Sequence, residues 1–156
     1  VFRHGAYVSQ GTLARTTRTA RRFFALLKHS ADRFAVTLQA WVILANHYHL
    51  MAIAPANTLS KFIEYLHSRS SHELNALDNA RGRKSWFQYR ETFITHQSSY
   101  LARVNYIHQN PVHHRVVATA ENYKWSSHAW FRDTKPALAK AVGQFKIDRL
   151  NIEDDF

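Results

Sequence analysis

Apolar positions along the chain repeat with two different spacings, and these predict an alternation of strands and helices. Runs in which apolar and β-branched residues dominate, or alternate with polar ones, are typical of strands. Such runs cover residues 5–13, 34–44, 47–53 and 85–94. Apolar residues three and four positions apart predict amphipathic helices. This spacing covers residues 16–32, 59–77 and 98–110. The predicted order is therefore strand, helix, strand, strand, helix, strand, helix, followed by a turn and a short helix within 121–131.

Polar and proline residues mark where these elements begin and end. Residues 34–44 and 47–53 should form an antiparallel pair joined by a tight turn at Asn46. Asn57 or Thr58 is expected to cap the helix over 59–77. For the third helix, the sequence predicts a cap at Ser98 or Ser99 and an end at Asn110, because Pro111 follows. Beyond residue 131 no further element is predicted.

The length and composition favour one domain. The chain has 156 residues and 46% hydrophobic residues, without an internal repeat or a linker. We expect a domain over 1–156, with a core at about 5–131 and a short extension at 132–156. The sequence has no cysteine, which excludes thiolate metal sites and a cysteine nucleophile. It begins with no signal peptide and has no apolar run of membrane-spanning length. A cytoplasmic, nucleoid-associated protein is the expectation.

Charge points to a polyanionic partner. The formal net charge is +10 with neutral histidines, and 13% of the residues are aromatic. Such a composition suits nucleic acid first and an anionic membrane surface second, and we expect no membrane partner. The candidate DNA-binding residues are Arg81, Arg83, Lys84, Trp86, Arg103 and Arg115. The aromatic residues of 85–94 have an alternative role as core on one face of a strand.

Two histidines lie within the apolar run at 47–53. Side chains alternate across a strand, so His47 and His49 share one face and Tyr48 takes the other. Two imidazoles on one face of a strand can bind one metal ion. The alternative is a pair of hydrogen-bonded core histidines.

The third helix carries a tyrosine and an asparagine on one face. Tyr106 and Asn110 are four residues apart, which places them one helical turn apart. A divalent ion held by two imidazoles and one amide oxygen would keep open positions for a phosphate. A tyrosine phenolate could then attack the phosphorus, and with an ordinary pKa near ~10 it would need the ion or nearby cations to ionise. Taken alone, each residue also fits an ordinary helix position.

The three motifs together resemble a known family. His47-Tyr48-His49 resembles the histidine–hydrophobe–histidine (HUH) motif of single-tyrosine transposases. The run from Tyr106 to Val112 resembles the Tyr-Ile-His-x-Asn-Pro-Val signature of their REP-associated branch. The run from Tyr123 to Ser127 resembles the Tyr-x-Trp-Ser-Ser element that follows it. The chain departs from the family after Pro111, where members commonly have Lys/Arg-x-Gly-Leu and this sequence lacks the glycine.

The resemblance implies a fold and a chemistry. The fold would be α+β, a ferredoxin-like antiparallel sheet flanked by helices. His47, His49 and Asn110 would hold Mg²⁺ or Mn²⁺, and Tyr106 would be the nucleophile. Family members nick single-stranded DNA beside hairpins, keep a 5′-phosphotyrosine link and can reverse the reaction. They act as homodimers or as monomers. Rival interpretations are a catalytically silent, domesticated transposase that binds hairpin DNA, a replication initiator or relaxase, and a hydrolase in which water attacks.

Overall fold

A computed structural model of the chain describes residues 4–11 and 16–145. Its centre is a four-stranded antiparallel sheet in the order β2-β3-β1-β4. The strands are β1 (His4–Gly11), β2 (Thr37–Ile43), β3 (His47–Ile53) and β4 (Trp86–Ile94). Helix α1 (Thr17–Arg33) connects β1 to β2, and α2 (Leu59–Leu77) connects β3 to β4. This order and connectivity confirm the ferredoxin-like α+β prediction.

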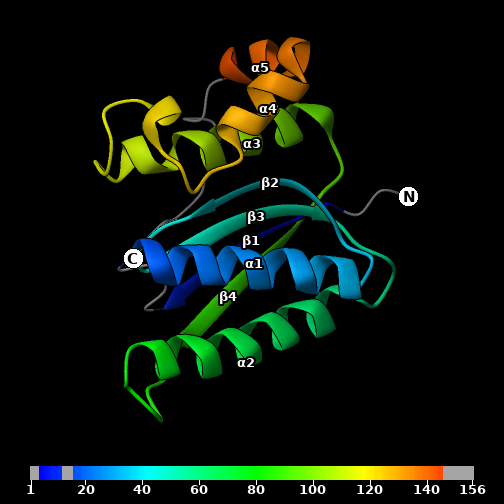
Figure 1. The fold of residues 1–156 in the computed structure, drawn as a ribbon. Coiled ribbons are helices and arrows are strands. Elements are labelled where there is room, and N and C mark those ends of the chain that lie inside the picture. The colour runs from blue at the N-terminus through cyan, green and yellow to red at the C-terminus, as the bar shows by residue number, and fades with distance from the viewer. Residues whose placement is uncertain (1–3, 12–15, 146–156) are drawn as a thin grey trace.

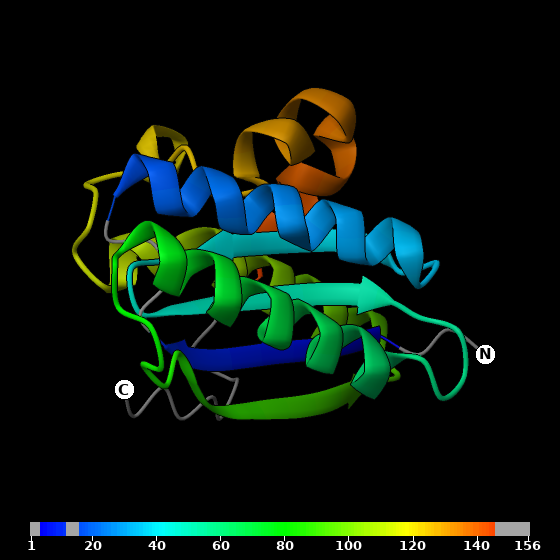
Figure 2. The ribbon, with the colours of Figure 1, turned by 60° about the horizontal axis from the view of Figure 1, so that its bottom comes forward.

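Helices cover both faces of the sheet. Figure 1 shows α1 and α2 on one side, and α3 (Gln97–His113), α4 (His128–Thr134) and α5 (Pro136–Gly143) on the other. A 3₁₀ turn, η1 (Ala120–Asn122), lies between α3 and α4. In Figure 2 the first two helices lie side by side in front of the strands. The contacts between α3 and the sheet fall on β2 and β3, so this helix covers one half of its face.

The alternation of side chains along β3 separates two hydrophobic cores. Tyr48 and Leu50 are fully buried in the core that lies under α1 and α2. Met51 points the other way, into the core shared by β2, α3 and the two following helices. His47 and His49 lie on the Met51 side by the same period of two. The prediction that Tyr48 faces the core away from the two histidines is confirmed.

The ends of α3 differ from the prediction. Its N-cap is His96, in extended conformation, and not Ser98 or Ser99. Its C-terminal end lies at His113, so Pro111 is inside the last turn and does not stop the helix at Asn110. A proline disfavours the helical conformation of the residue before it through a steric clash, but the clash does not exclude that conformation. Asn110 is held in the helix by side-chain contacts with β3, described below, and these outweigh that preference.

Other boundaries fall within a few residues of the prediction. Helix α2 has the predicted bounds, with Thr58 as its N-cap. Strand β2 begins at Thr37 because Ala35, with φ 52°, turns the chain just before it. Helix α5 was not predicted, although Pro136 at its first turn and Gly143 at its end are helix-boundary signals. Residues 12–13 of the predicted first strand lie outside the described residues.

Candidate functional site

The two histidines of β3 are buried on the α3 side of the sheet. His47 is 1% exposed and His49 is 3% exposed. Their ring centroids are 5.1 Å apart, with the ring planes almost perpendicular. Strand β3 is an inner strand, paired on both sides, so its backbone holds the two rings in a fixed relation.

Asn110 of α3 lies between the two imidazoles. Its side chain is fully buried. Its Oδ1 atom is 3.2 Å from His47 Nε2, and its Nδ2 atom is 3.0 Å from His49 Nε2. The amide thus joins residues more than sixty positions away in the sequence. It is this contact that fixes the last turn of α3 against the sheet.

Asn46 completes the arrangement, and the sequence analysis assigned it no role beyond the turn. Its Oδ1 atom is 2.8 Å from His47 Nδ1. An amide oxygen only accepts hydrogen bonds, and a neutral imidazole has one N–H group to donate. We assign that proton to Nδ1, because its contact with an amide oxygen is the shorter of the two, which leaves the lone pair on Nε2. His49 Nε2 accepts from the Asn110 Nδ2 amide in the same way. The Nε2 lone pairs of both imidazoles are therefore directed toward the side-chain amide of Asn110.

This donor set fits a metal ion. With Nδ1 of His47 protonated, its Nε2 lone pair faces Asn110 Oδ1, and two acceptor atoms 3.2 Å apart repel each other. A cation between such atoms would satisfy both. Imidazole nitrogens and an amide oxygen are common ligands of divalent metals, and a second hydrogen bond to the imidazole is the usual way a ligand tautomer is fixed. Across the described ranges, no group of three or more His, Asp or Glu side chains is arranged to bind a metal ion. The candidate metal site therefore consists of two histidines and one amide.

Burial keeps the histidines neutral. Loss of hydration lowers the pKa of His47 to about 4, with a further contribution from His114. Burial also lowers the pKa of His49, with His47 and His114 adding to the effect. Neutral imidazole is the form that binds metals. Both side chains are thus in their ligand form at neutral pH.

Tyr106 lies one helical turn before Asn110, on the same side of α3. Its ring centroid is 5.3 Å from that of His49, in an edge-to-face arrangement. The side chain is 8% exposed, and its hydroxyl finds no hydrogen-bond partner among the described residues. A buried hydroxyl without a partner costs about 1–3 kcal/mol, which is uncommon away from functional sites. The sheet face that carries the two histidines is therefore covered by the helix that carries Tyr106, within one chain.

His114 is a further residue that the sequence analysis did not connect with this site. It follows Asn110 by four positions, at the C-cap of α3. Its ring centroid is 4.8 Å from that of His47. The predicted helix ended at Asn110, which placed His114 in the loop that follows it. The longer helix is what brings His114 to the site.

The predicted DNA-binding residues divide into exposed and packed side chains. Arg81 and Lys84 are exposed, and Lys84 lies over the ring of Phe87, which is 57% exposed. Arg83 forms a 2.7 Å ion pair with Asp78. Trp86 is partly buried against the first core, where it stacks on His67 and donates a 2.9 Å hydrogen bond to Ser70.

The other two candidates both lie on or next to α3. Arg115 is exposed just beyond its C-terminus, and Arg103 is partly buried within it. The strand register places Gln10 opposite His47 and Gly11 opposite Trp86. The basic turn before β4 is thus at the end of the sheet where His47 lies. A DNA-binding role for these residues stays a prediction.

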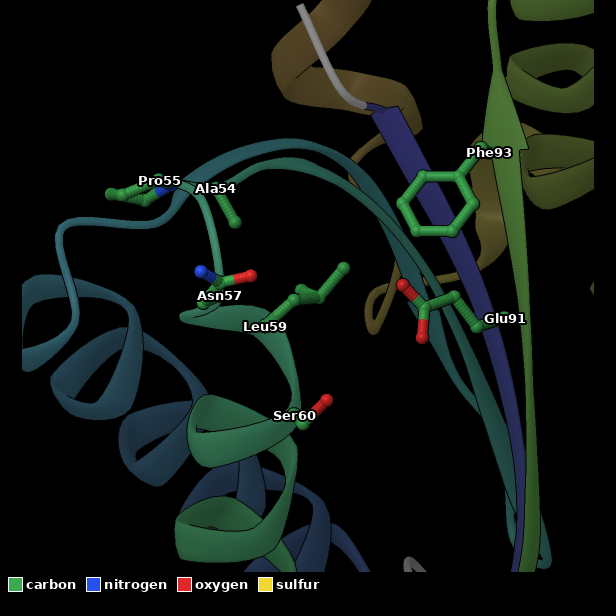
Figure 3. Close-up of a pocket in the computed structure, with 7 residues that line it drawn as sticks. All are labelled: Ala54, Pro55, Asn57, Leu59, Ser60, Glu91 and Phe93. Carbon is green, nitrogen blue, oxygen red and sulfur yellow. The ribbon is translucent and has the colours of Figure 1, made fainter.

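A pocket of about 180 Å³ lies elsewhere, between the start of α2 and the edge strand β4. Figure 3 shows the Glu91 carboxylate and the Phe93 ring on one wall, with Leu59 and Ser60 on the other. Leu59 belongs to the core under α1 and α2, so the pocket opens on the face opposite Tyr106. It contains no histidine and no cation. The pocket is therefore separate from the site formed by the two histidines, Tyr106 and Asn110. In the described part of the chain, no helix combines the length and the apolar character needed to cross a bilayer.

Comparisons with known proteins bear on the family and on the fold. The family model for IS200-like transposases matches residues 12–110. The structure of a REP-associated tyrosine transposase bound to a REP hairpin aligns with a TM-score of 0.72 and 20% identity, covering 100% of this chain and 90% of that one. A crystal structure of a protein assigned as a transposase, from Deinococcus radiodurans R1, aligns with a TM-score of 0.51 and 13% identity, covering 66% of this chain and 88% of that one. Among curated protein sequences, none matches the chain.

Proposed function

The chain belongs to the IS200-like transposase family, and we propose that it nicks and rejoins single-stranded DNA next to a hairpin through a covalent tyrosine intermediate. The observation that carries this proposal is the convergence of His47, His49, Tyr106 and Asn110. Two elements about sixty residues apart bring a buried, unpartnered phenol beside two neutral imidazoles and an amide. A structural pair of core histidines would need no such phenol.

In the proposed reaction, Tyr106 is the nucleophile. Its hydroxyl oxygen forms a bond to the phosphorus of the DNA backbone while the bond from phosphorus to the 3′ oxygen breaks. The phenol loses its proton, and the departing 3′ oxygen gains one. The 5′ phosphate stays on the tyrosine, and attack by a 3′-hydroxyl reverses the step. No nucleotide triphosphate is needed, because the phosphodiester energy is kept in the phosphotyrosine bond.

We propose His47, His49 and Asn110 as the residues that would hold Mg²⁺ or Mn²⁺. When bound, such an ion supplies positive charge that polarises the phosphodiester and favours the phenolate. Asn46 keeps His47 in the tautomer whose Nε2 atom carries the lone pair. Burial by α3 excludes water from the phenol, which favours attack by Tyr106 over hydrolysis.

Hairpin DNA is the proposed substrate class. The relative in the aligned structure is bound to a REP hairpin. The +10 net charge of this chain favours DNA, and exposed Arg81, Lys84 and Arg115 lie at the end of the sheet where His47 is buried. Phe87, next to this basic turn, is 57% exposed and offers a ring on which a base could stack.

A cleavage assay tests the proposal. The probe is an end-labelled single-stranded oligonucleotide that carries the imperfect palindrome nearest to the gene with its flanks. We expect cleavage with Mn²⁺ or Mg²⁺ and none with a chelator. His47→Ala combined with His49→Ala should abolish cleavage but change the hairpin Kd by less than about threefold, because most affinity comes from phosphate charge. Binding without any cleavage by the unmodified protein would instead identify a catalytically silent hairpin-binding protein.

A further inference from the structure

Arg103 lies on the side of α3 that faces the sheet, in line with the candidate catalytic residues. Successive residues of a helix are 100° apart, so Arg103 is about 60° around the axis from Tyr106 and about 20° from Asn110. It is about 4.5 Å before Tyr106 along the axis, slightly less than one turn of about 5.4 Å. Side chains of a helix lean toward its N-terminus, so the Tyr106 ring leans toward Arg103.

Two nitrogens of the Arg103 guanidinium have no partner among the residues that the structure describes. Its Nε and Nη1 atoms are buried, and neither forms a hydrogen bond with any described residue. Burial lowers the pKa of Arg103, and no acidic neighbour within the described part of the chain offsets that effect. A buried cation without a counter-ion reduces stability. Buried guanidinium nitrogens in proteins are normally paired, so these two can accept an anionic ligand as their partner.

The surroundings of Arg103 fit an anion. The Tyr106 hydroxyl is also buried without a partner. On the sheet, Arg90 of β4 is in register with Val8 of β1, and Val8 is in register with His49. Ile94 packs in the core on the α3 side. Arg90 precedes it by four residues in β4, and every second side chain of a strand is on the same face, so Arg90 shares the face of Ile94. Because α3 contacts β2 and β3, the β1 and β4 half of the face lies beside the helix.

We infer that Arg103 binds the non-bridging oxygens of the phosphate that Tyr106 attacks. This inference rests on the proposed function and adds a catalytic residue to it. The guanidinium fork matches two phosphate oxygens, and the charge on these oxygens is compensated while the phosphorus gains the Tyr106 oxygen and loses the 3′ oxygen. The phosphate in turn supplies acceptors for Nε and Nη1, which have none among the described residues.

Two substitutions of Arg103 test the inference, with Arg69→Met as the matched control. Arg69 is an exposed arginine of α2, on the opposite side of the sheet, paired with Glu73. The assay is the single-turnover rate of covalent attachment at saturating hairpin DNA. Arg103→Met should lower this rate about 100-fold or more. Arg103→Lys should recover part of it, since it keeps the charge but not the fork. Arg69→Met should leave the rate unchanged.

Thermal unfolding separates a catalytic role from a structural one. A residue that stabilises the fold lowers the Tm when it is replaced. An unpaired buried cation has the opposite effect, so Arg103→Met should raise the Tm of the DNA-free protein. A lowered Tm that accompanies the loss of rate would overturn the inference and make Arg103 a structural residue.

A modified substrate locates the contact. A methylphosphonate at the mapped cleavage position removes the charge of that phosphate. In a Tyr106→Phe background, where DNA binds without reacting, this change should weaken binding, and Arg103→Met should cancel the difference between the two DNAs. If Arg103→Met weakens binding to both DNAs equally, the residue contacts another phosphate and the inference is wrong. If the unmodified protein attaches DNA and Arg103→Met does so at the same rate, the inference alone fails. If the unmodified protein attaches no DNA, the proposed function fails with it.

Discussion

At the scale of single residues, Arg115 adopts a backbone conformation that glycine favours. Its φ is 57°. Its N–H donates to the Val112 carbonyl, and the N–H of Val116 donates to the Pro111 carbonyl. These two bonds form the Schellman motif that commonly ends a helix with glycine at this position. The sequence lacks the family's usual glycine here, yet the turn keeps the conformation that glycine would provide.

Replacing Arg115 with glycine should therefore stabilise the protein. We expect Arg115→Gly to raise the free energy of unfolding by about 1 kcal/mol relative to Arg115→Ala, because alanine keeps the steric cost of positive φ. Both changes remove the same charge, so the comparison isolates the backbone. Urea unfolding of the two variants measures the difference. Equal stability of the glycine and alanine variants would show that the turn is not strained.

The residues of the candidate site could be predicted only in part. The period of two in β3 placed His47 and His49 together and Tyr48 opposite, and the helical spacing placed Tyr106 with Asn110. The contacts of Asn46 and His114 with His47 depend on how α3 packs on the sheet. The burial of the Arg103 guanidinium has the same origin. Such tertiary contacts leave no local signal in the sequence.

At the scale of elements, the Tyr-x-Trp-Ser-Ser segment extends the sheet beyond β2. Tyr123 donates a 2.6 Å hydrogen bond to the Ile43 carbonyl, and the Ile43 N–H donates to the Trp125 carbonyl. Ser126 forms an isolated bridge with Val42. Edge strands carry unpaired backbone groups, and this segment pairs those of β2. The sequence alone predicted a turn and a short helix here, because backbone pairing between distant segments has no periodic pattern.

Ser127 is the residue of this segment on which stability should depend most. It is fully buried, and its Oγ atom accepts a 2.9 Å hydrogen bond from the Trp41 N–H and is 3.0 Å from His108 Nε2. Ser127→Ala should lower the free energy of unfolding by about 1–3 kcal/mol, since the Trp41 N–H loses this acceptor.

The matched control is Ser126→Ala. Its hydroxyl accepts only from the nearby His128 N–H within the same turn. Chemical denaturation of both variants should show a clearly larger loss for Ser127→Ala. Losses of similar size would mean that the contact with Trp41 has no special weight.

At the scale of the whole molecule, the fold could be predicted from the order of the elements. The structure of the C-terminal region could not. Helix α5 buries Val142 in the second core and packs beside α3. The short run before Gly143 has too few positions for a clear helical period. The position of α5 depends on the apolar surface of α3 and α4, against which it packs.

Buried neutral histidines should make stability depend on pH. Burial lowers the pKa of His67 to about 4 and that of His108 to about 3, from about 6.5 in the unfolded chain. Between these values the unfolded chain binds protons that the folded chain does not. The free energy of unfolding should therefore fall as the pH drops from about 6.5 toward 4, with a slope of about 1.4 kcal/mol per pH unit for each such proton.

Urea unfolding at pH 7, 6 and 5 checks this dependence. His67→Gln should reduce the slope by about one proton, because glutamine does not titrate. An unchanged slope in this variant would show that His67 is already charged in the folded protein.

The most direct test of the central claim is to locate the DNA on the protein. The protein is incubated with Mn²⁺ and the labelled hairpin oligonucleotide, digested with nuclease and protease, and analysed by mass spectrometry. The account predicts a nucleotide joined through its 5′ phosphate to Tyr106, and no adduct in Tyr106→Phe. An adduct that persists in Tyr106→Phe, or one that maps to another residue, would contradict it.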